Sequence, residues 1–313
     1  MKIDMRDAFF EKLVELARLD ERIIVLSADH GAFALKKFEE EMPERYINMG
    51  IAEQNMVGVA AGLAASGKIV FVYGISPFVS LRVLEQLTID VAAMQLPVSV
   101  ISVGAGFTYS TDGPTHQGLQ DISAVATIPG MTILNSSDPV NTRAFAEMAV
   151  SSKKPHYIRI EKEKLSEFHP KRDVLQFLLE GFSCLNDVDS RVLLISTGLI
   201  SHLSMDVADA FESELGIPLA VIDIHQIKPI TEKLLGRLTH YDHIVILEES
   251  YRSTLANELA VAILKREIPV RLSVVDCGER YFFKGASRAE MADESGFSKE
   301  AIFDSLAKIL GVE

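Results

Sequence analysis

Short apolar segments of strand character alternate along this chain with segments of helical periodicity. In the first half, the strand-like segments are residues 22–29, 68–74, 97–104, 131–135 and 156–160. The alternation starts again in the second half, with strand-like residues 191–198, 218–225, 243–250 and 270–277. Continuously apolar strands separated by helices need cover on both faces, which is typical of parallel sheets. We therefore expect an α/β protein with two doubly wound, mainly parallel-sheet domains.

The helices expected between these strands are recognisable by periodicity and by their first residues. Residues 9–19 are amphipathic at helical spacing, and a helix is predicted over about 77–94. Asp138 followed by Pro139 has the pattern of an N-cap with proline at the first helical position, which predicts a helix to about residue 150.

A charged and irregular stretch, EKEKLSEFHPKRDVLQFLLEGFSCLN, separates the two alternating halves. We interpret it as a linker followed by the entry to a second domain. The predicted organisation is a first domain over residues 1–165, a linker over 166–188 and a second domain over 189–313.

Size and charge restrict the classes of function. With 313 residues, 48% of them hydrophobic, the chain can form two domains that each have a core. A net charge of −13 argues against a general nucleic-acid surface, because phosphate binding needs clustered Lys and Arg. It does not argue against one phosphorylated substrate held by one or two basic residues.

The cellular location is indicated by the lack of recognisable targeting signals in the sequence. The opening MKIDMRDAFFEKLVELARLD lacks the apolar core and cleavage site of a signal peptide. The longest weakly charged run, residues 91–110, contains Pro97 and two glycines, which disfavours a membrane span. Cys184 and Cys277 form no ligand or redox spacing. We expect a reduced, cytoplasmic protein with neither a membrane nor a nucleic-acid partner.

The segment NMGIAEQNMVGVAAGLAASG, residues 48–67, predicts a helix of buried character with Glu53 in its first turn. Asn48 or Gly50 is expected to cap it. One interpretation is a carboxylate that complements the helix dipole, contributing about 0.3–1 kcal/mol. The small residues that follow, such as Gly58 and Gly62, would let another element approach closely. A carboxylate beside such packing would be partly desolvated and could share a proton with a buried nitrogen heterocycle.

Two further segments follow predicted strands and so lie at the sheet edge where open α/β folds bind ligands. GFTYSTDGPTHQGLQD, residues 106–121, contains Asp112, Thr115, His116, Gln117 and Asp121, all able to hydrogen-bond a polyol. His116 could alternatively be a turn histidine bonded to the backbone.

The segment YGISPFVSLRVLEQLTID, residues 73–90, brings Phe78 near the same edge, where it could stack on a flat ring or belong to the core. Arg82 and Glu85 could simply pair on a helix face.

Several common catalytic motifs are missing from the sequence. GAGFTY lacks the third glycine of a dinucleotide fingerprint, and there is no P-loop lysine motif. No His, Cys or Asp cluster has metal-ligand spacing, and no Gly-x-Ser-x-Gly elbow occurs.

Taken together, these residues resemble the C-terminal half of a transketolase. The resemblance runs through NMGIAEQNMVGVAAGLA, FVSLRVLEQ and DGPTHQGLQDISAVATIPGMTIL, and it continues more loosely through the second domain. Thiamine diphosphate enzymes in general share the helix that carries the Glu, whereas DGPTHQ is far more specific to transketolases. The resemblance implies a thiamine diphosphate pyrimidine-binding domain followed by a transketolase C-terminal-like domain.

The resemblance also implies the residues that contact the cofactor, thiamine diphosphate. Glu53 would hydrogen-bond a ring nitrogen of the aminopyrimidine and favour the imino tautomer that activates the thiazolium carbon. Phe78 would stack on the pyrimidine. Arg82 stands where a helix arginine recurs in split transketolases, and Asp29, at the end of the first strand, is a further expected cofactor contact.

On the substrate side, the resemblance implies that Asp112 and His116 contact sugar hydroxyls, with His116 also helping proton transfer. Arg159 or Lys162, after the segment HYI, would hold a phosphate or the distal end of the sugar.

The expected assembly follows from a missing motif. Full-length transketolases carry a preceding domain whose Gly-Asp-Gly motif and downstream Asn hold a divalent cation, and this motif does not occur here. The resemblance therefore implies that an N-terminal transketolase subunit supplies the diphosphate site and the cation, Mg or Ca, while this chain holds no metal. We expect a heterotetramer of two copies of each subunit, and a catalytically silent homodimer of this chain alone.

Departures from the family pattern leave the substrate open. The segment EESYRSTLANELA, residues 248–260, keeps a Glu pair but lacks the His and the glycine-rich turn that often follow it. The positions that bind phosphate in full-length transketolases are not clearly matched, so the acceptor need not be a pentose phosphate.

The first hypothesis is transfer of a two-carbon ketol unit from a ketose to an aldehyde. A β-subunit of a 2-oxoacid dehydrogenase is the second hypothesis, and a deoxyxylulose phosphate synthase is the third; DGPTHQ argues against both. A non-catalytic partner subunit with the same fold is the fourth. The joint presence of Glu53, Phe78, Asp112 and His116 argues against it, because a degenerate copy would not need all four.

Overall fold

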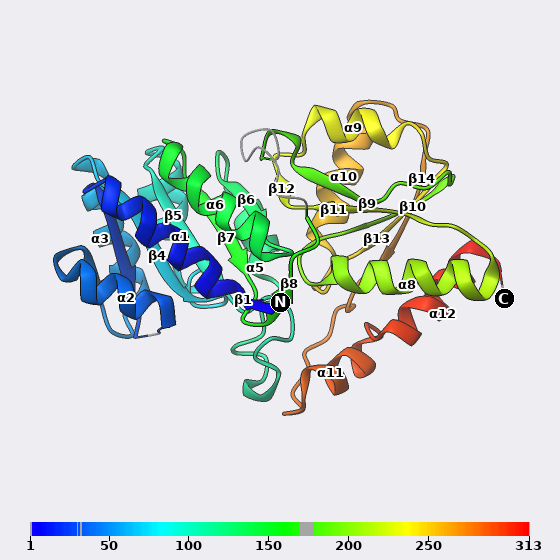
Figure 1. Cartoon of the computed structure of the whole chain (residues 1–313), viewed down its shortest axis with the longest axis horizontal. Coiled ribbons are helices and arrows are strands. Elements are labelled where there is room, and N and C mark those ends of the chain that lie inside the picture. The colour runs from blue at the N-terminus through cyan, green and yellow to red at the C-terminus, as the bar shows by residue number, and fades with distance from the viewer. Residues whose placement is uncertain (1, 30, 32, 170–177, 313) are drawn as a thin grey trace.

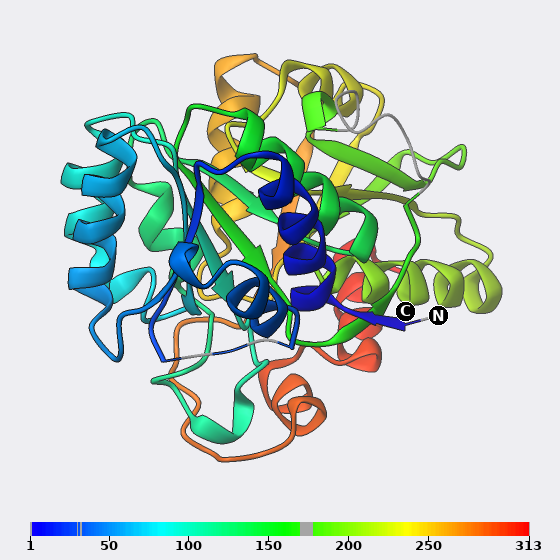
Figure 2. The same cartoon turned by 60° about the vertical axis from the view of Figure 1, so that its left-hand side comes forward.

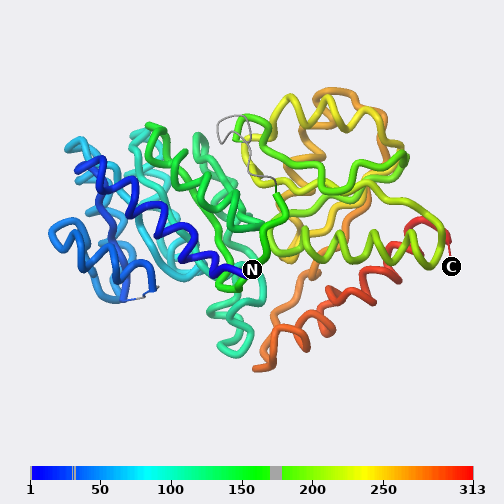
Figure 3. Tube along the Cα trace, in the orientation of Figure 1, coloured from blue at the N-terminus to red at the C-terminus, as the bar shows by residue number. Residues whose placement is uncertain are grey.

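The computed structural model describes residues 2–29, 31, 33–169 and 178–312 and arranges them as two α/β units, each built on its own sheet (Figure 1). Figure 3 follows the trace in the same orientation and shows the two units side by side. Each sheet lies between layers of helices. The expectation of two mainly parallel-sheet α/β domains is confirmed.

The first sheet has seven described strands, six of which are parallel. In order across the sheet they are β12 (Gln226–Lys228), β6 (Thr132–Asn135), β7 (His156–Ile160), β5 (Val98–Val103), β4 (Ile69–Ile75), β2 (Ile23–Ser27) and β3 (Tyr46–Asn48). The antiparallel strand, β12, comes from the second half of the chain. Because the six parallel strands run in one direction, their carboxyl ends meet at one edge of the sheet.

Helices cover both faces of this sheet because alternate strand residues point to opposite sides. One face packs against α1 (Met5–Leu19), α2 (Phe33–Glu41) and α6 (Pro139–Ser151). The other packs against α3 (Glu53–Ala65), α5 (Asp121–Ala126) and residues 81–92. Within the described ranges, no helix is both long and apolar enough to cross a membrane.

The second sheet has five described strands. Across the sheet they are β14 (Arg271–Val275), β13 (His243–Leu247), β10 (Val192–Ser196), β11 (Ala220–Ile224) and the antiparallel β9 (Phe182–Asn186). One face packs against α8 (Ile200–Leu215) and α12 (Lys299–Leu310), and the other against α9 (Glu232–Leu238) and α10 (Thr254–Lys265). After β14, the chain turns towards the first unit and forms α11 (Arg288–Ser295) (Figure 1).

β1 (Lys2–Asp4) pairs antiparallel with β8 (Lys164–Ser166), and both strands precede those of the second sheet in the chain. β12 joins the units, because it comes from the second half and extends the first sheet. One hydrophobic cluster also continues from the α3 face of the first sheet to the α10 face of the second. Within the stretch 166–188, which we expected to be a linker, β9 belongs to the second sheet, and residues 170–177 lie outside the described residues.

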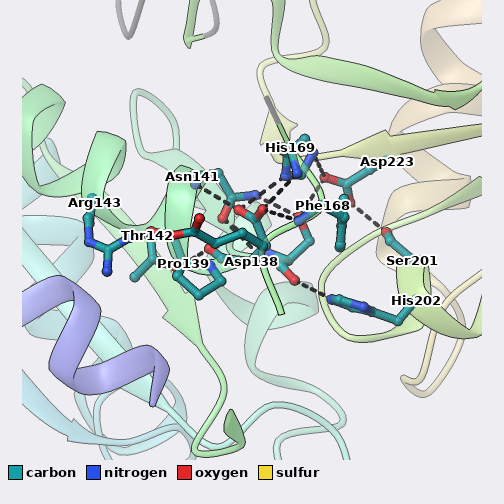
Figure 4. A network of polar contacts seen from close by, with 12 residues as sticks. Asp138, Pro139, Asn141, Thr142, Arg143, Phe168, His169, Ser201, His202 and Asp223 are labelled. Carbon is teal, nitrogen blue, oxygen red and sulfur yellow. Dashed lines mark hydrogen bonds and ion pairs between the residues drawn. The ribbon is translucent and has the colours of Figure 1, made fainter. Parts of the chain in front are cut away.

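A buried polar network at the boundary links the units through a histidine (Figure 4). His169 Nδ1 lies 3.1 Å from Asp138 Oδ1, and its Nε2 lies 3.3 Å from Asp223 Oδ2. Asp138 caps α6 of the first unit, as predicted, whereas Asp223 belongs to β11 of the second. Burial lowers the pKa of His169, but the two carboxylates outweigh burial and raise it to about 9. The imidazole is therefore a buried cation between the units at neutral pH.

The helix predicted over residues 77–94 is wrong in its beginning and in its regularity. The structure has in sequence a 3-10 turn (Leu81–Val83), the single turn α4 (Leu84–Gln86) and a π-helical segment (Leu87–Ala92). The Ser80 hydroxyl donates to the Ser76 carbonyl oxygen at 2.6 Å. This bond, and the turn around it, delay the helix, because a serine can offer the backbone an alternative to helical bonding.

The predicted cap of α3 is also wrong. The N-cap is Ala52, which makes no side-chain capping bond. Asn48 instead bonds to the backbone before the helix begins. Its Oδ1 accepts hydrogen bonds from the backbone N–H of Gly50 at 2.9 Å and of Asp29 at 3.2 Å. Asn48 therefore joins the end of β2 to the turn that precedes Glu53.

Candidate active site

Neighbouring strands of the first sheet deliver the predicted residues to one edge. Asp29 follows β2, Glu53 begins the helix after β3, and Phe78 follows β4. The loop of residues 104–120 follows β5. Because β3, β2, β4 and β5 are adjacent in the sheet, their carboxyl ends place these groups along a continuous edge.

Glu53 is the first residue of α3, and its side chain is only 4% exposed. Its Oε2 accepts a hydrogen bond from Arg82 Nη1 at 2.7 Å. Arg82 therefore pairs with Glu53, and its expected alternative partner, Glu85, makes no ion pair with it among the described residues. Within those residues no donor is bonded to Glu53 Oε1, so this oxygen can still bond to another molecule.

Phe78 connects this ion pair to the histidine of the DGPTHQ loop. The Arg82 guanidinium carbon lies 4.2 Å above the centre of the Phe78 ring, which is a cation–π contact. The His116 ring meets Phe78 edge-on, with centroids 5.0 Å apart. Glu53, Arg82, Phe78 and His116 thus form one contiguous row, although they come from three separate parts of the chain.

The loop that carries His116 is closed at its neck by two backbone bonds. Gly106 and Gly118 donate their N–H groups to each other's carbonyl oxygens, each at 2.9 Å. At the tip, Asp112 is exposed and His116 is half-buried. His116 Nδ1 lies 2.9 Å from Thr115 Oγ1. This contact leaves Nε2 as the ring nitrogen available to a substrate.

Lys162 and Asp29 follow other strands at the same edge of the sheet. Lys162 Nζ lies 4.9 Å from the centre of the Tyr109 ring, so this exposed amine stands beside the loop. Burial raises the pKa of Tyr109 to about 12, which keeps its hydroxyl protonated. Asp29 is exposed and has a φ of 52°, an uncommon value for a residue other than glycine.

Three residues considered for the sugar site lie inside the protein instead. The Arg159 side chain is 4% exposed and lies 3.7 Å from Asp121, which also accepts a 2.8 Å bond from the Tyr157 hydroxyl. Gln117 is buried and donates to the carbonyl oxygen of Phe282 at 3.2 Å. Asp121 and Gln117 therefore anchor the loop rather than face a polyol, and Arg159 has almost no surface to offer a phosphate.

Sequence reasoning missed a group of buried charges beneath the loop. Glu161, Glu248, Glu249 and Arg288 are grouped there with Arg159, and the two adjacent glutamates follow β13. Burial raises the pKa of Glu248 and of Glu249. The available signal was the pair of acidic residues directly after an apolar strand, whose role the sequence alone left open.

Comparison with known proteins assigns both units of the chain. Residues 1–167 match the transketolase pyrimidine binding domain, and residues 185–302 match the transketolase C-terminal domain. This chain belongs to the transketolase family. The predicted resemblance is therefore confirmed.

Among relatives within the transketolase family, an apulose-4-phosphate transketolase subunit of Phocaeicola vulgatus is 32% identical over 302 residues, which cover 96% of this chain and 95% of the relative. The 6-deoxy-6-sulfo-D-fructose transketolase subunit SqwH of Clostridium sp. (strain MSTE9) is 34% identical over 247 residues, covering 79% of this chain and 76% of the relative. A 1-deoxy-D-xylulose-5-phosphate synthase of Fusobacterium nucleatum is 33% identical over 269 residues, but these cover only 43% of the synthase.

Solved transketolase structures agree with this assignment. A split gene transketolase, described as an inactive beta4 tetramer, superposes with a TM-score of 0.86 and 27% identity, covering 100% of this chain and 99% of that one. The transketolase of Pichia stipitis superposes with a TM-score of 0.81 and 18% identity, and the match covers 46% of its chain. At that identity the second comparison shows the shared fold alone.

Proposed function

We propose that this chain is the C-terminal subunit of a split, thiamine diphosphate-dependent transketolase. In this proposal it moves a two-carbon ketol unit from a ketose donor to an aldehyde acceptor, together with an N-terminal subunit. The observation that carries the proposal is the contiguous row of Glu53, Arg82, Phe78 and His116 at the carboxyl edge of the first sheet.

The residues of this row fit the aminopyrimidine end of the cofactor. A flat heterocycle with ring nitrogens needs a buried acid at one edge and an aromatic surface beside it. Glu53 supplies the acid with a side chain that is 4% exposed, and Phe78 supplies the surface. When bound, thiamine diphosphate supplies the carbon nucleophile that takes up and releases the ketol unit.

Each residue of the chain has a separate task in this proposal. Glu53 Oε1 exchanges a proton with a ring nitrogen, while Arg82 holds Oε2 and keeps the carboxylate oriented. Phe78 and Asp29 are the further residues that position the ring. These roles require the carboxylate to stay shielded from water, which its burial provides.

On the sugar side, His116 is the group that holds or moves protons at the hydroxyls and the carbonyl oxygen. Its Nε2 is available because Nδ1 faces Thr115. Asp112 is exposed at the same loop tip and accepts hydrogen bonds from sugar hydroxyls. Lys162, beside Tyr109, offers a cation to an anionic group on the substrate.

The partner in this proposal is a chain that carries the Gly-Asp-Gly motif and a divalent cation. Relatives named as transketolase subunits support a two-chain enzyme, and we propose a heterotetramer with two copies of each chain. The split gene relative described as an inactive beta4 tetramer supports a silent homo-oligomer when the partner is absent.

The proposal is tested by reconstituting ketol-transfer activity with the wild-type chain and with a variant at Glu53. The chain is mixed with its N-terminal partner, thiamine diphosphate, Mg²⁺ and a panel of ketose donors with aldehyde acceptors. Glu53→Gln should lower kcat by about 100-fold or more, because it removes the proton-sharing group. Pyruvate is included as a donor, because turnover with pyruvate but with no ketose would favour the 2-oxoacid dehydrogenase or the synthase alternative. A need for an aldehyde acceptor in that reaction would favour the synthase.

A matched control separates this role from a general effect of lost charge. Glu85→Gln makes the same chemical change at an exposed position of α4 and should leave kcat within about twofold. Thermal unfolding checks that both variants fold. Full activity in Glu53→Gln would disprove the cofactor role, and no activity in any wild-type mixture would favour the non-catalytic alternative.

A further inference from the structure

The loop that carries His116 belongs to the first domain, but its large apolar side chains are buried in the second. Phe107 and Leu119 are in the same hydrophobic cluster as Phe282 and the residues of α8 and α12. Phe107 meets the ring of Phe282 edge-on at 5.1 Å. Figure 2 shows this loop beside the segment between β14 and α11, below both sheets. The second domain therefore supplies the surface on which the loop rests.

The neck of the loop fits closely against a carboxylate of the second domain. The backbone N–H of Phe107 donates to Glu249 Oε2 at 3.3 Å. Gly106 has a φ of +53°, and a Cβ there would lie 1.6 Å from the same oxygen. Only glycine allows this approach, so the backbone at the neck is placed by the position of Glu249.

Arg288, the first residue of α11, fixes Glu249 and the loop together. Its Nη2 donates to Glu249 Oε2 at 2.5 Å, and its Nη1 donates to Thr108 Oγ1 at 2.9 Å. Nη1 also lies 3.4 Å from Glu161 Oε2, to which Thr108 donates at 2.6 Å. One guanidinium thus connects a loop residue to a carboxylate from each domain.

The charges in this contact are shielded from solvent, which makes it rigid. Side-chain exposures are 1% for Glu161, 6% for Glu249 and 21% for Arg288. A buried carboxylate that loses its cation is strongly destabilised, so these groups have little freedom to separate. Further along the loop, the Gln117 side chain and the Leu119 carbonyl oxygen bond to the backbone of Phe282 and Tyr251.

We propose that Glu249 and Arg288 are positioning residues that act through His116. From the second domain they hold the loop so that His116 stays against Phe78, beside the Glu53 carboxylate. The catalytic part of this inference rests on the proposed function. It gives the second domain a direct task in the reaction, because the loop is held by contacts with that domain as well as by contacts with the first sheet.

The first measurement compares Arg288→Met with Arg191→Met in the reconstituted complex. Arg191 forms an exposed ion pair with Asp242 in the second domain, so its variant is a matched change away from the loop. Arg288→Met should lower kcat by about 10- to 100-fold, because small displacements of a reacting group have effects of this size. The Kd of thiamine diphosphate, measured by calorimetry, should change by less than about threefold, since Glu53 and Phe78 lie outside the loop.

A double variant tests whether the effect passes through His116. In a His116→Ala background, adding Arg288→Met should lower kcat no further, because the group being positioned is gone. A role in folding alone would reduce kcat by the same factor in both backgrounds, and that outcome would overturn the proposal. Arg288→Lys should recover part of the wild-type kcat.

Amide hydrogen exchange tests the same idea without turnover. Residues 107–118 should exchange faster in Arg288→Met than in the wild type or Arg191→Met, while α3 should be unchanged. Should Arg288→Met fail to fold, Thr108→Val removes the loop side of the contact and should show the same pattern more weakly. Unchanged exchange in the loop would overturn the proposal. If the wild-type complex lacks transketolase activity, the proposed function fails, and this measurement still decides whether the loop is held.

Discussion

At the scale of single residues, the cation that pairs with the Glu53 carboxylate is much less buried than the acid. Arg82 is 41% exposed, whereas Glu53 is 4% exposed. Burial of the acid excludes water from one side of the pair, which strengthens the attraction between the two charges. Because Arg82 also lies over Phe78, it fixes two of the proposed cofactor contacts in one geometry.

Replacing Arg82 with an uncharged residue should show how much the Glu53–Arg82 ion pair contributes to the stability of the chain. Arg82→Met leaves the buried carboxylate without its cation and should lower the free energy of unfolding by about 1–3 kcal/mol. Glu53→Gln in the same chain should recover most of the loss, because a neutral amide needs no cation. Urea unfolding of the four chains in this cycle measures the coupling. If the changes in unfolding free energy of the two single variants simply add up in the double variant, Glu53 and Arg82 do not stabilise each other.

Sequence reasoning located the positions of this row but not its contacts. Glu53 was predicted at the start of a helix because a lone acid before an Ala- and Gly-rich run is visible in the sequence. The partner of Arg82 was not visible, because an i,i+3 acid, Glu85, is a local alternative to an acid 29 residues away. The burial of Arg159 was also hidden, because the acids around it come from separate parts of the chain.

At the scale of secondary-structure elements, periodic segments were predictable and irregular ones were not. α1 and α6 were found from their spacing and from the Asp138-Pro139 start. The region after β4 was not, because its hydrogen bonds change from 3-10 to α to π within twelve residues, Leu81–Ala92. This local irregularity accompanies the placement of Phe78 and Arg82, which a regular helix from Pro77 would have turned to other directions.

The narrow neck of the His116 loop should be intolerant of added volume. A Cβ at Gly118 would lie 2.3 Å from the Gly104 carbonyl oxygen, so Gly118→Ala must open the neck. We expect a loss of about 1–3 kcal/mol in unfolding free energy and a larger fractional loss of kcat than of cofactor affinity. Gly58→Ala is the control, because its Cβ meets nothing within 4 Å, and in α3 it should stabilise by about 0.5–1 kcal/mol. A stable, fully active Gly118→Ala would show that the neck is not a fixed element.

At the scale of the whole molecule, the two domains are joined by polar contacts that the sequence could not pair. The alternation of strands and helices predicted both sheets, but β12 of the first sheet comes from the second half of the chain. Likewise, His169 lies in a stretch expected to be a linker, and yet it bridges the buried Asp138 and Asp223 (Figure 4). Such contacts depend on the final packing of the domains, which periodicity along the chain does not encode.

The bridge formed by His169 should make the free energy of unfolding depend on pH in the alkaline range. The pKa of His169 is raised from its ordinary value of 6.5 to about 9, so its contribution to stability is complete below 6.5 and is lost as the pH rises through 9. Between about pH 7.5 and about pH 10 the wild type should lose about 2 kcal/mol more unfolding free energy than His169→Gln, which has no proton to release. The control is His202→Gln: burial lowers the pKa of His202, which therefore stays neutral over this range, and the variant should keep the wild-type slope. Urea unfolding at several pH values measures the slopes, and equal slopes for His169→Gln and the wild type would mean that the imidazole is not a charged link between the domains.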